Sequence, residues 1–156
     1  MNTSITANTR TKGFTVIELM IVVVLIAIIA TIGYPSFTEF TASQRVRAAA
    51  SALYDSLLLA RSEAVKRNTA VSMTVTDLAN GWTIVVTSDN TLLRTQEAFA
   101  GLQFSPANPS IAYNRFGRLS SGAGTEITAT SASSSKSRCI TIDTVGRPRV
   151  AEGFCT

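Results

Sequence analysis

The side chains that could carry out catalysis are few in this sequence. The chain of 156 residues contains no histidine, and its many serines and threonines have no evident base that would activate them. Two cysteines without histidine fall short of the four nitrogen or sulfur ligands of a structural zinc site. The sequence shows no glycine-rich phosphate loop and no carboxylates at metal-binding spacing. We therefore expect no enzyme activity and no cofactor or metal.

The two cysteines, Cys139 and Cys155, lie near the end of the sequence and enclose 15 residues. An even pair in an exported chain is typical of a disulfide, which would stabilise the fold by about 3 kcal/mol. The alternative is a pair of free, buried thiols. A bridge at these positions would also fix the turn around Gly146.

Basic residues are concentrated in the last third of the sequence, although the formal net charge of +4 is too small to indicate nucleic-acid binding. A tight turn at Gly146 would hold Arg147 and Arg149 ready to bind phosphates. We expect Lys136 and Arg138 to widen this basic surface. We also expect Phe154 to stack on a base. Arg115 and Arg118 are weaker candidates for binding phosphates. The alternatives are solvated turn arginines, or arginines that bind the acidic side chains of a protein partner.

The N-terminus combines a basic leader with a long apolar segment. Arg10 and Lys12 precede Gly13, and the 20 residues of 14–33 follow it with one charge among them. A helix of that length spans about 30 Å, which matches the hydrocarbon core of a bilayer. The cleavage site of a secretory signal follows its apolar segment, whereas the small residue Gly13 precedes this one. A cut after Gly13 would remove the leader and keep the membrane helix.

The one charge in the apolar segment is Glu18. A carboxylate costs about 3 kcal/mol at the centre of a membrane helix and less toward its edge. After cleavage, the new amino group of Phe14 would lie about one helical turn away. We expect the amino group of a neighbouring subunit to pair with Glu18 in an assembly. The alternative is that Glu18 only reaches to the membrane surface.

Residues 12–19, Lys-Gly-Phe-Thr-Val-Ile-Glu-Leu, resemble the cleavage signal of type IV pilins and type II secretion pseudopilins. The resemblance implies that a prepilin peptidase cuts between Gly13 and Phe14 and methylates the Phe14 amine. It places the family's assembly glutamate at Glu18 and its helix-breaking proline at Pro35. We expect Pro35 to kink the helix without ending it, because helical patterning resumes soon afterwards.

Apolar residues three and four positions apart predict an amphipathic helix that ends near Asn68. They are Val46, Ala50, Leu53, Leu57, Ala60 and Ala64. We expect four parts in the chain: a cleaved leader over 1–13, a membrane half of the helix over 14–34, an amphipathic half over 35–68, and a β-rich part over 69–156.

Alternating patterns after residue 68 predict β-strands. The expected strands cover 71–76, 82–87, 92–95, 111–116, 126–130, 138–143 and 149–152. The serine-rich segment 131–135 is expected to be a mobile loop. The predicted fold class is therefore α+β, with one long N-terminal helix packed on a mostly antiparallel sheet, as in the pilin fold.

Three segments resemble one group within the family, the GspH/FimT group. Residues 59–68 are similar to the end of its helix, and Phe116-Gly117-Arg118 and Gly146-Arg147-Pro148-Arg149 resemble its two Gly-Arg turns. The resemblance implies a non-catalytic minor pilin that takes part in the assembly of a type IV pilus. The alternative is a minor pseudopilin of a type II secretion system. Pilins of the FimT type with such a late turn are DNA receptors in natural transformation, which implies DNA binding as well.

The resemblance also implies the partners and location of the protein. The partners would be other pilins and minor pilins, prepilin peptidase, inner-membrane lipid and double-stranded DNA. The chain would first lie in the inner membrane with its globular part in the periplasm, and then in a pilus at the cell surface.

Overall fold

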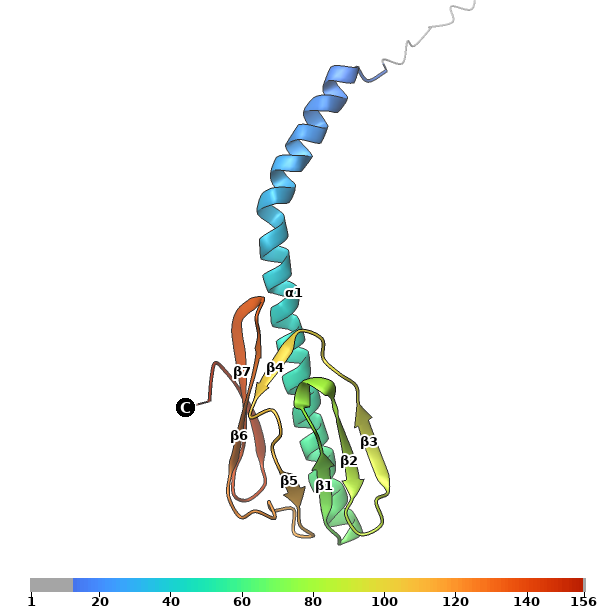
Figure 1. Ribbon diagram of the computed structural model, residues 1–156, viewed down its shortest axis with the longest axis vertical. Helices are drawn as coiled ribbons and strands as arrows, with labels where there is room; N and C mark the ends of the chain where they lie inside the picture. Colours follow the sequence, from blue (N-terminus) through green and yellow to red (C-terminus); the bar gives the residue numbers. More distant parts are fainter. Residues whose placement is uncertain (1–12, 156) are drawn as a thin grey trace, which may run out of the picture. The chain divides into compact units, whose positions relative to one another are not determined.

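The computed structural model describes residues 13–155, except the side chains of residues 32, 33 and 35, and divides into two compact units between Ser36 and Phe37. Helix α1 covers Val16–Arg67 and therefore contributes to both units (Figure 1). All described side chains before Phe37 are exposed, whereas the hydrophobic core begins at Val46 and lies wholly in the second unit. The second unit thus contains the whole described core.

The predicted apolar stripe of α1 is confirmed, because each of its six residues is at most 1% exposed. Ser56 is buried on the same face. Its hydroxyl donates to the carbonyl oxygen of Ala52 (2.7 Å) and accepts a hydrogen bond from Nε1 of Trp82 (2.9 Å). The helix ends as expected, since Asn68 has a positive φ of 52° and the N–H groups of Asn68 and Thr69 donate to the last helical carbonyls.

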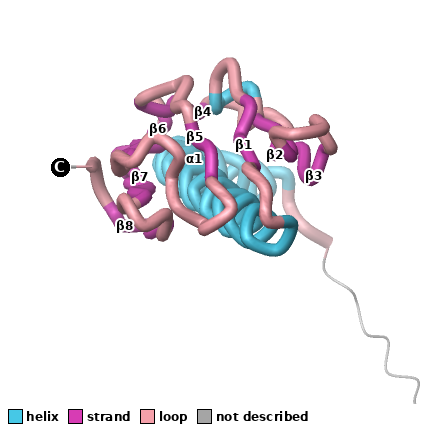
Figure 2. Tube along the Cα trace, turned by 90° about the horizontal axis from the view of Figure 1, so that it is seen from below, coloured by secondary structure: helices cyan, strands magenta, loops and turns pink. Residues whose placement is uncertain are grey.

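Eight strands and one short 3-10 helix follow α1 in the described residues. They are β1 (Val71–Thr74), η1 (Leu78–Asn80), β2 (Trp82–Val86), β3 (Leu92–Gln96), β4 (Leu102–Ser105), β5 (Ile111–Tyr113), β6 (Thr125–Ser131), β7 (Ser134–Ile142) and β8 (Pro148–Glu152). One antiparallel sheet has the order β3-β2-β1-β5 and the other β4-β6-β7-β8. The strands lie on one side of α1 (Figure 2). The α+β prediction of a long helix packed on antiparallel strands is confirmed.

Three details of the strand prediction were wrong. The strands form two sheets instead of one, and β4 was not predicted. The segment 131–135 is a tight hairpin, in which Ser131 pairs with Ser134 across a two-residue turn. Its serines serve as hydrogen-bond donors, since Oγ of Ser131 donates to the carbonyl oxygen of Gly101 (3.0 Å). The serine-rich composition therefore gave a misleading indication of mobility.

No single helix in the described residues is long and apolar enough to cross a membrane. Two parts of α1 on either side of a short break, Val16–Thr31 and Ser36–Arg67, have the length and composition of a membrane span only when they are taken together.

Candidate functional site

The expected processing site lies immediately before α1. Gly13 and Phe14 are exposed and outside the helix; the rest of the leader lies outside the described residues. Thr15 and Glu18 form a capping box at the first turn. The backbone N–H of Thr15 donates to Oε2 of Glu18 (2.8 Å), and the N–H of Glu18 donates to Oγ1 of Thr15 (3.3 Å). Sequence analysis missed this Thr-x-x-Glu pattern, which gives the Glu18 carboxylate a partner within its own chain. Pro35 lies within α1.

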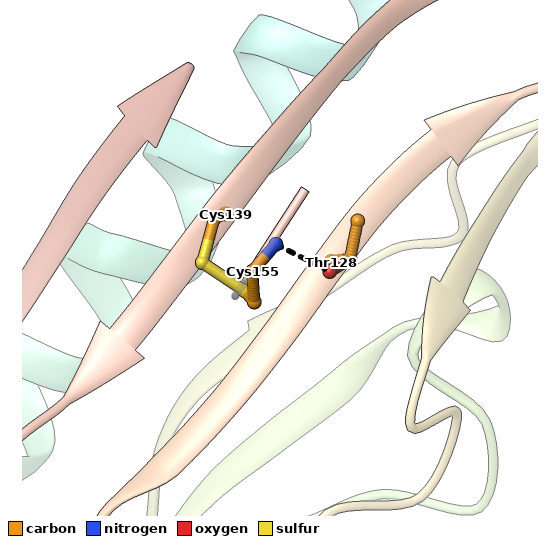
Figure 3. Close-up of a disulfide and its surroundings, with 3 residues drawn as sticks. All are labelled: Thr128, Cys139 and Cys155. Atoms are coloured by element: carbon orange, nitrogen blue, oxygen red, sulfur yellow. Dashed lines mark hydrogen bonds between the residues drawn. A yellow bond between two sulfur atoms is a disulfide. The ribbon is translucent and has the colours of Figure 1, made fainter. Parts of the chain in front are cut away.

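The predicted disulfide between Cys139 and Cys155 is confirmed, with the two Cα atoms 5.0 Å apart (Figure 3). Cys139 directly precedes the core residue Ile140 on β7. Because successive strand residues face opposite sides of a sheet, Cys139 faces away from the helix. The backbone N–H of Cys155 donates to Oγ1 of Thr128 (3.3 Å) on β6. The bridge therefore holds the C-terminal tail over the outer face of the second sheet.

The two Gly-Arg turns of the sequence meet in the structure. Gly117 and Gly146 both have positive φ, and a Cβ atom on Gly146 would clash with the carbonyl oxygen of Gly117. Arg61 of α1 reaches both turns, since its Nε donates to the oxygen of Gly117 (2.9 Å) and its guanidinium to the oxygen of Val145 (3.4 Å). Close packing and positive φ therefore explain why each turn has a glycine at this position. The role of Arg61 was not predicted.

Exposed basic residues flank both of the turns that meet here. Arg118 follows Gly117, and its Cα would lie 3.3 Å from a Cβ on Gly146. The Arg115 guanidinium stacks on the Phe116 ring, 5.0 Å from its centroid, and Phe116 is 70% exposed. We call this surface the basic end; it consists of Arg115, Phe116, Arg118, Arg147 and Arg149, all of them exposed.

The two arginines of the β7–β8 turn differ in their partners. Nε of Arg147 lies 2.8 Å from Oδ2 of Asp143, and its backbone N–H donates to Oδ1 (2.8 Å). The backbone N–H of Arg147, followed by smaller contributions that include its guanidinium, lowers the pKa of the Asp143 carboxyl below its usual value. Arg149 forms no ion pair with any residue that the structure describes. Of the two arginines, Arg147 therefore has an acidic partner among the described residues, and Arg149 has none.

Lys136 and Arg138 do not join the basic end. The guanidinium of Arg138 lies 2.7 Å from Oε1 of Glu152, opposite it on β8, and both Lys136 and Arg138 line a groove beside α1. Arg149 lies opposite Thr141 of β7. Thr141 comes three positions after Arg138 on this strand, an odd number, so the two residues face opposite sides of the sheet. Since successive strand residues face opposite sides, the four predicted DNA-binding residues are divided between two surfaces.

A long N-terminal helix packed on antiparallel sheets defines the pilin class of fold. The chain is similar to crystal structures of the type IV minor pilin FimU from Pseudomonas aeruginosa, with TM-scores of 0.58 and 0.60 and 23% identity. These matches cover 67% and 72% of this chain and 91% and 92% of FimU. It is also similar to the minor pseudopilin EpsH of the Vibrio cholerae type 2 secretion system, with a TM-score of 0.53 and 17% identity. That match covers 69% of this chain and 97% of EpsH.

The sequence model of the type II transport protein GspH matches residues 49–146, and that of the prokaryotic N-terminal methylation motif matches residues 8–34. The chain belongs to the GspH family, as its resemblance to the GspH/FimT group predicts. The type IV major pilin protein PilE1 of Neisseria gonorrhoeae is 46% identical over 39 residues. That match spans 25% of this chain and about a quarter (24%) of the length of PilE1.

Proposed function

We propose that this protein is a non-catalytic minor pilin of a type IV pilus, held in the inner membrane by residues 14–34 until it joins the filament. The observation that carries the proposal is an N-terminal methylation motif joined to a GspH-family globular unit in one chain. The C-terminal disulfide suits the oxidising periplasm. Its partners are other pilins and minor pilins, and its first partner is a prepilin peptidase.

The exposed, non-helical Gly13–Phe14 bond supports processing at this position, because a peptidase can reach it. The peptidase removes 1–13 and leaves Phe14 as a methylated N-terminus. In the filament, the exposed apolar side chains of α1 pack against neighbouring helices, and Glu18 exchanges its capping contact for the amino group of a neighbour.

The experiment is mass spectrometry of sheared pili. We expect the filament fraction to contain the chain beginning at Phe14. Gly13→Val should leave the uncut precursor in the membrane, because a branched side chain replaces the small residue at the cut. The control Thr11→Val places the same branched residue two positions earlier in the leader and should be processed normally. A mature chain that starts elsewhere, for example after Gly33, contradicts the proposal.

A minor pseudopilin of a type II secretion system is the second candidate. The observation that favours it is the GspH family itself, which is described as a type II transport protein. Deletion of the gene distinguishes the two: loss of pili with normal protein secretion supports the pilin, and the reverse result supports the pseudopilin.

We also propose that the basic end binds double-stranded DNA. Four exposed arginines and one exposed aromatic ring lie within three residues of Gly117 or Gly146, the two glycines whose turns meet there. Guanidinium groups can bind phosphate oxygens with two parallel hydrogen bonds. Since phosphates carry no sequence information, binding should be independent of sequence and should weaken with salt, with a slope worth about 3 phosphates.

The test is a DNA shift with the second unit, residues 37–156, which contains the whole described core and the disulfide. Arg147→Gln with Arg149→Gln should abolish most of the shift, while the fold persists because exposed ion pairs contribute little to stability. Arg45→Gln with Arg94→Gln removes the same charge elsewhere and should have a small effect. Asp143→Asn should strengthen binding, because it removes the carboxylate that pairs with Arg147.

Two results would exclude DNA binding at the basic end. One is a folded unit that gives no salt-sensitive shift at low ionic strength. The other is an equal loss of affinity in the two double variants, which would indicate attraction by overall charge only.

A further inference from the structure

The second cationic surface of the globular unit is a groove of about 250 Å³ between α1 and strands β7 and β8. Figure 1 shows the β6–β7 hairpin lying alongside α1. The groove is lined by Phe40, Gln44 and Arg47 from α1 and by Lys136, Arg138 and Glu152 from β7 and β8. All of these residues belong to the second unit. None of them belongs to the basic end.

The groove holds three cations and one carboxylate, and the cations are not equivalent. Arg138 is held by Glu152 at 2.7 Å, and its side chain is only 17% exposed. Arg47 is 3.9 Å from the same carboxylate and 61% exposed, so most of its donors remain available. Lys136 is exposed and has no ion pair within the described part of the chain. Arg47 and Lys136 therefore offer N–H donors to an anion. Arg138 and Glu152 pair with each other and form the part of the groove that β7 and β8 contribute.

The helical wall of the groove changes from apolar to cationic along α1. Phe37, Phe40, Gln44 and Arg47 are three, four and three positions apart, so they share one helix face. Phe37 and Phe40 are 66% and 59% exposed. The hairpin is fastened to this part of α1, since Oγ of Ser135 donates to Oε1 of Glu39 (2.7 Å). Lys136, the next residue along the hairpin, lines the groove together with Phe40.

The order of these residues matches the order of layers at a membrane surface. Phe37 comes four positions after Gly33, the end of the apolar segment, and aromatic rings are enriched at the boundary between hydrocarbon and headgroups. Arg47 lies about 15 Å farther along the helix axis than Phe37, at 1.5 Å per residue. Phosphates lie in the layer just outside the hydrocarbon, and long basic side chains can extend back toward that layer.

We propose that this groove binds the phosphate headgroup of an anionic phospholipid in the membrane that holds α1. The inference rests on the proposed function in one respect, namely that residues 14–34 lie in a membrane. The lipid phosphate binds Arg47 and Lys136, while Phe37 and Phe40 contact its glycerol and upper acyl chains. This contact sets the globular unit against the membrane surface before assembly and is lost when the subunit leaves the membrane.

The test is cosedimentation of residues 37–156 with vesicles at low salt. We expect binding to vesicles that contain phosphatidylglycerol and none to vesicles of phosphatidylcholine alone. Arg47→Gln and Lys136→Gln should each weaken binding by about 5-fold, the effect of one cation near an anionic surface. The matched control is Arg45→Gln, which removes an exposed charge two residues from Arg47 but outside the groove. It should change binding by less than about 2-fold.

Three results would overturn the proposal. One is the absence of binding to anionic vesicles, which would favour the acidic side chain of a neighbouring subunit as the occupant. Another is an equal loss in Arg45→Gln and Arg47→Gln, which would indicate diffuse attraction. A third is full displacement by inorganic phosphate at matched ionic strength, which would indicate a site for the free anion. Since the vesicle assay uses neither the apolar segment nor pili, its failure leaves the pilin proposal standing, and a failure in the pilus assay leaves the vesicle result standing.

Discussion

The parts of α1 before and after Ser36 differ in where their apolar side chains lie. From Val16 to Ile29 the large apolar residues are 47–78% exposed, whereas from Val46 to Ala64 an apolar stripe is at most 1% exposed. Both parts are regular helix, so the difference lies in the partner. The second part is covered by strands of its own chain. The first part exposes its apolar surface over all sides, which requires a cover from outside the chain, either lipid or other helices.

The largest effect should come from Glu18, which tests the part without a cover. Glu18→Ala should leave cleavage and folding intact but strongly reduce the amount of chain in sheared filaments, because the pairing charge is lost. Immunoblots of membrane and filament fractions measure this. Asp55→Ala, an exposed acid on the second part of the same helix, should assemble normally. Normal incorporation of Glu18→Ala would show that the pairing is dispensable.

Two matched leucine substitutions compare the two parts directly. Leu53 is fully buried, so Leu53→Ala should lower the free energy of unfolding by about 2–5 kcal/mol. Leu25 is 53% exposed, and Leu25→Ala should leave the stability of the globular unit unchanged. Urea denaturation of the full chain in detergent, followed by circular dichroism, measures both. Equal losses would mean that the two parts of the helix unfold together.

The disulfide has a somewhat smaller expected effect within the second unit. Replacing Cys139 and Cys155 by serine should lower the free energy of unfolding by about 3 kcal/mol, because the unfolded chain is no longer restricted. Urea denaturation measures the loss. Reductant should destabilise the natural protein by the same amount and leave the double variant unaffected. A natural protein that is insensitive to reductant would contradict this account.

The smallest effect concerns Tyr113, whose buried hydroxyl has no hydrogen-bond partner in the described residues. Burial raises its pKa from the ordinary value of 10.0 to about 12. Folding therefore favours the neutral phenol, and this contribution to stability is complete below pH 10 and lost as the pH rises toward 12.

Tyr113→Phe removes both the unpartnered hydroxyl and this titration. It should increase the free energy of unfolding by about 1 kcal/mol at neutral pH. It should also flatten the loss of stability between pH 10 and 12, the range of the raised pKa. Urea denaturation at pH 7 and at several alkaline values measures this. Tyr54→Phe is the control and should keep the alkaline loss, and a flattened profile in that variant would contradict the assignment to Tyr113.

Local patterns in the sequence predict most of the helix. The apolar segment and the buried stripe depend on composition and on three- and four-residue spacing, which the chain carries without reference to distant parts. The end at Asn68 was predicted for the same reason. The methylation motif was also recognisable, because its residues are contiguous.

Contacts between distant segments could not be predicted in this way. The close approach of Gly117 to Gly146 depends on how two turns, far apart in the sequence, pack on Arg61. The division into two sheets depends on the pairing of β4 with β6, in which the paired residues lie 23 to 29 positions apart in the sequence. The separation of Arg138 from Arg149 follows from strand alternation, but only once the register of β7 with β8 is known.

Trp82 is the only tryptophan in the chain, and its indole N–H donates to Ser56 on the helix while its ring stacks on Phe99 at 5.8 Å. Its intrinsic fluorescence therefore comes from a single site at the boundary between α1 and the first sheet. A red shift of the emission would report that water has entered this boundary. The protein thus carries its own optical probe for any change that loosens the helix from the sheet.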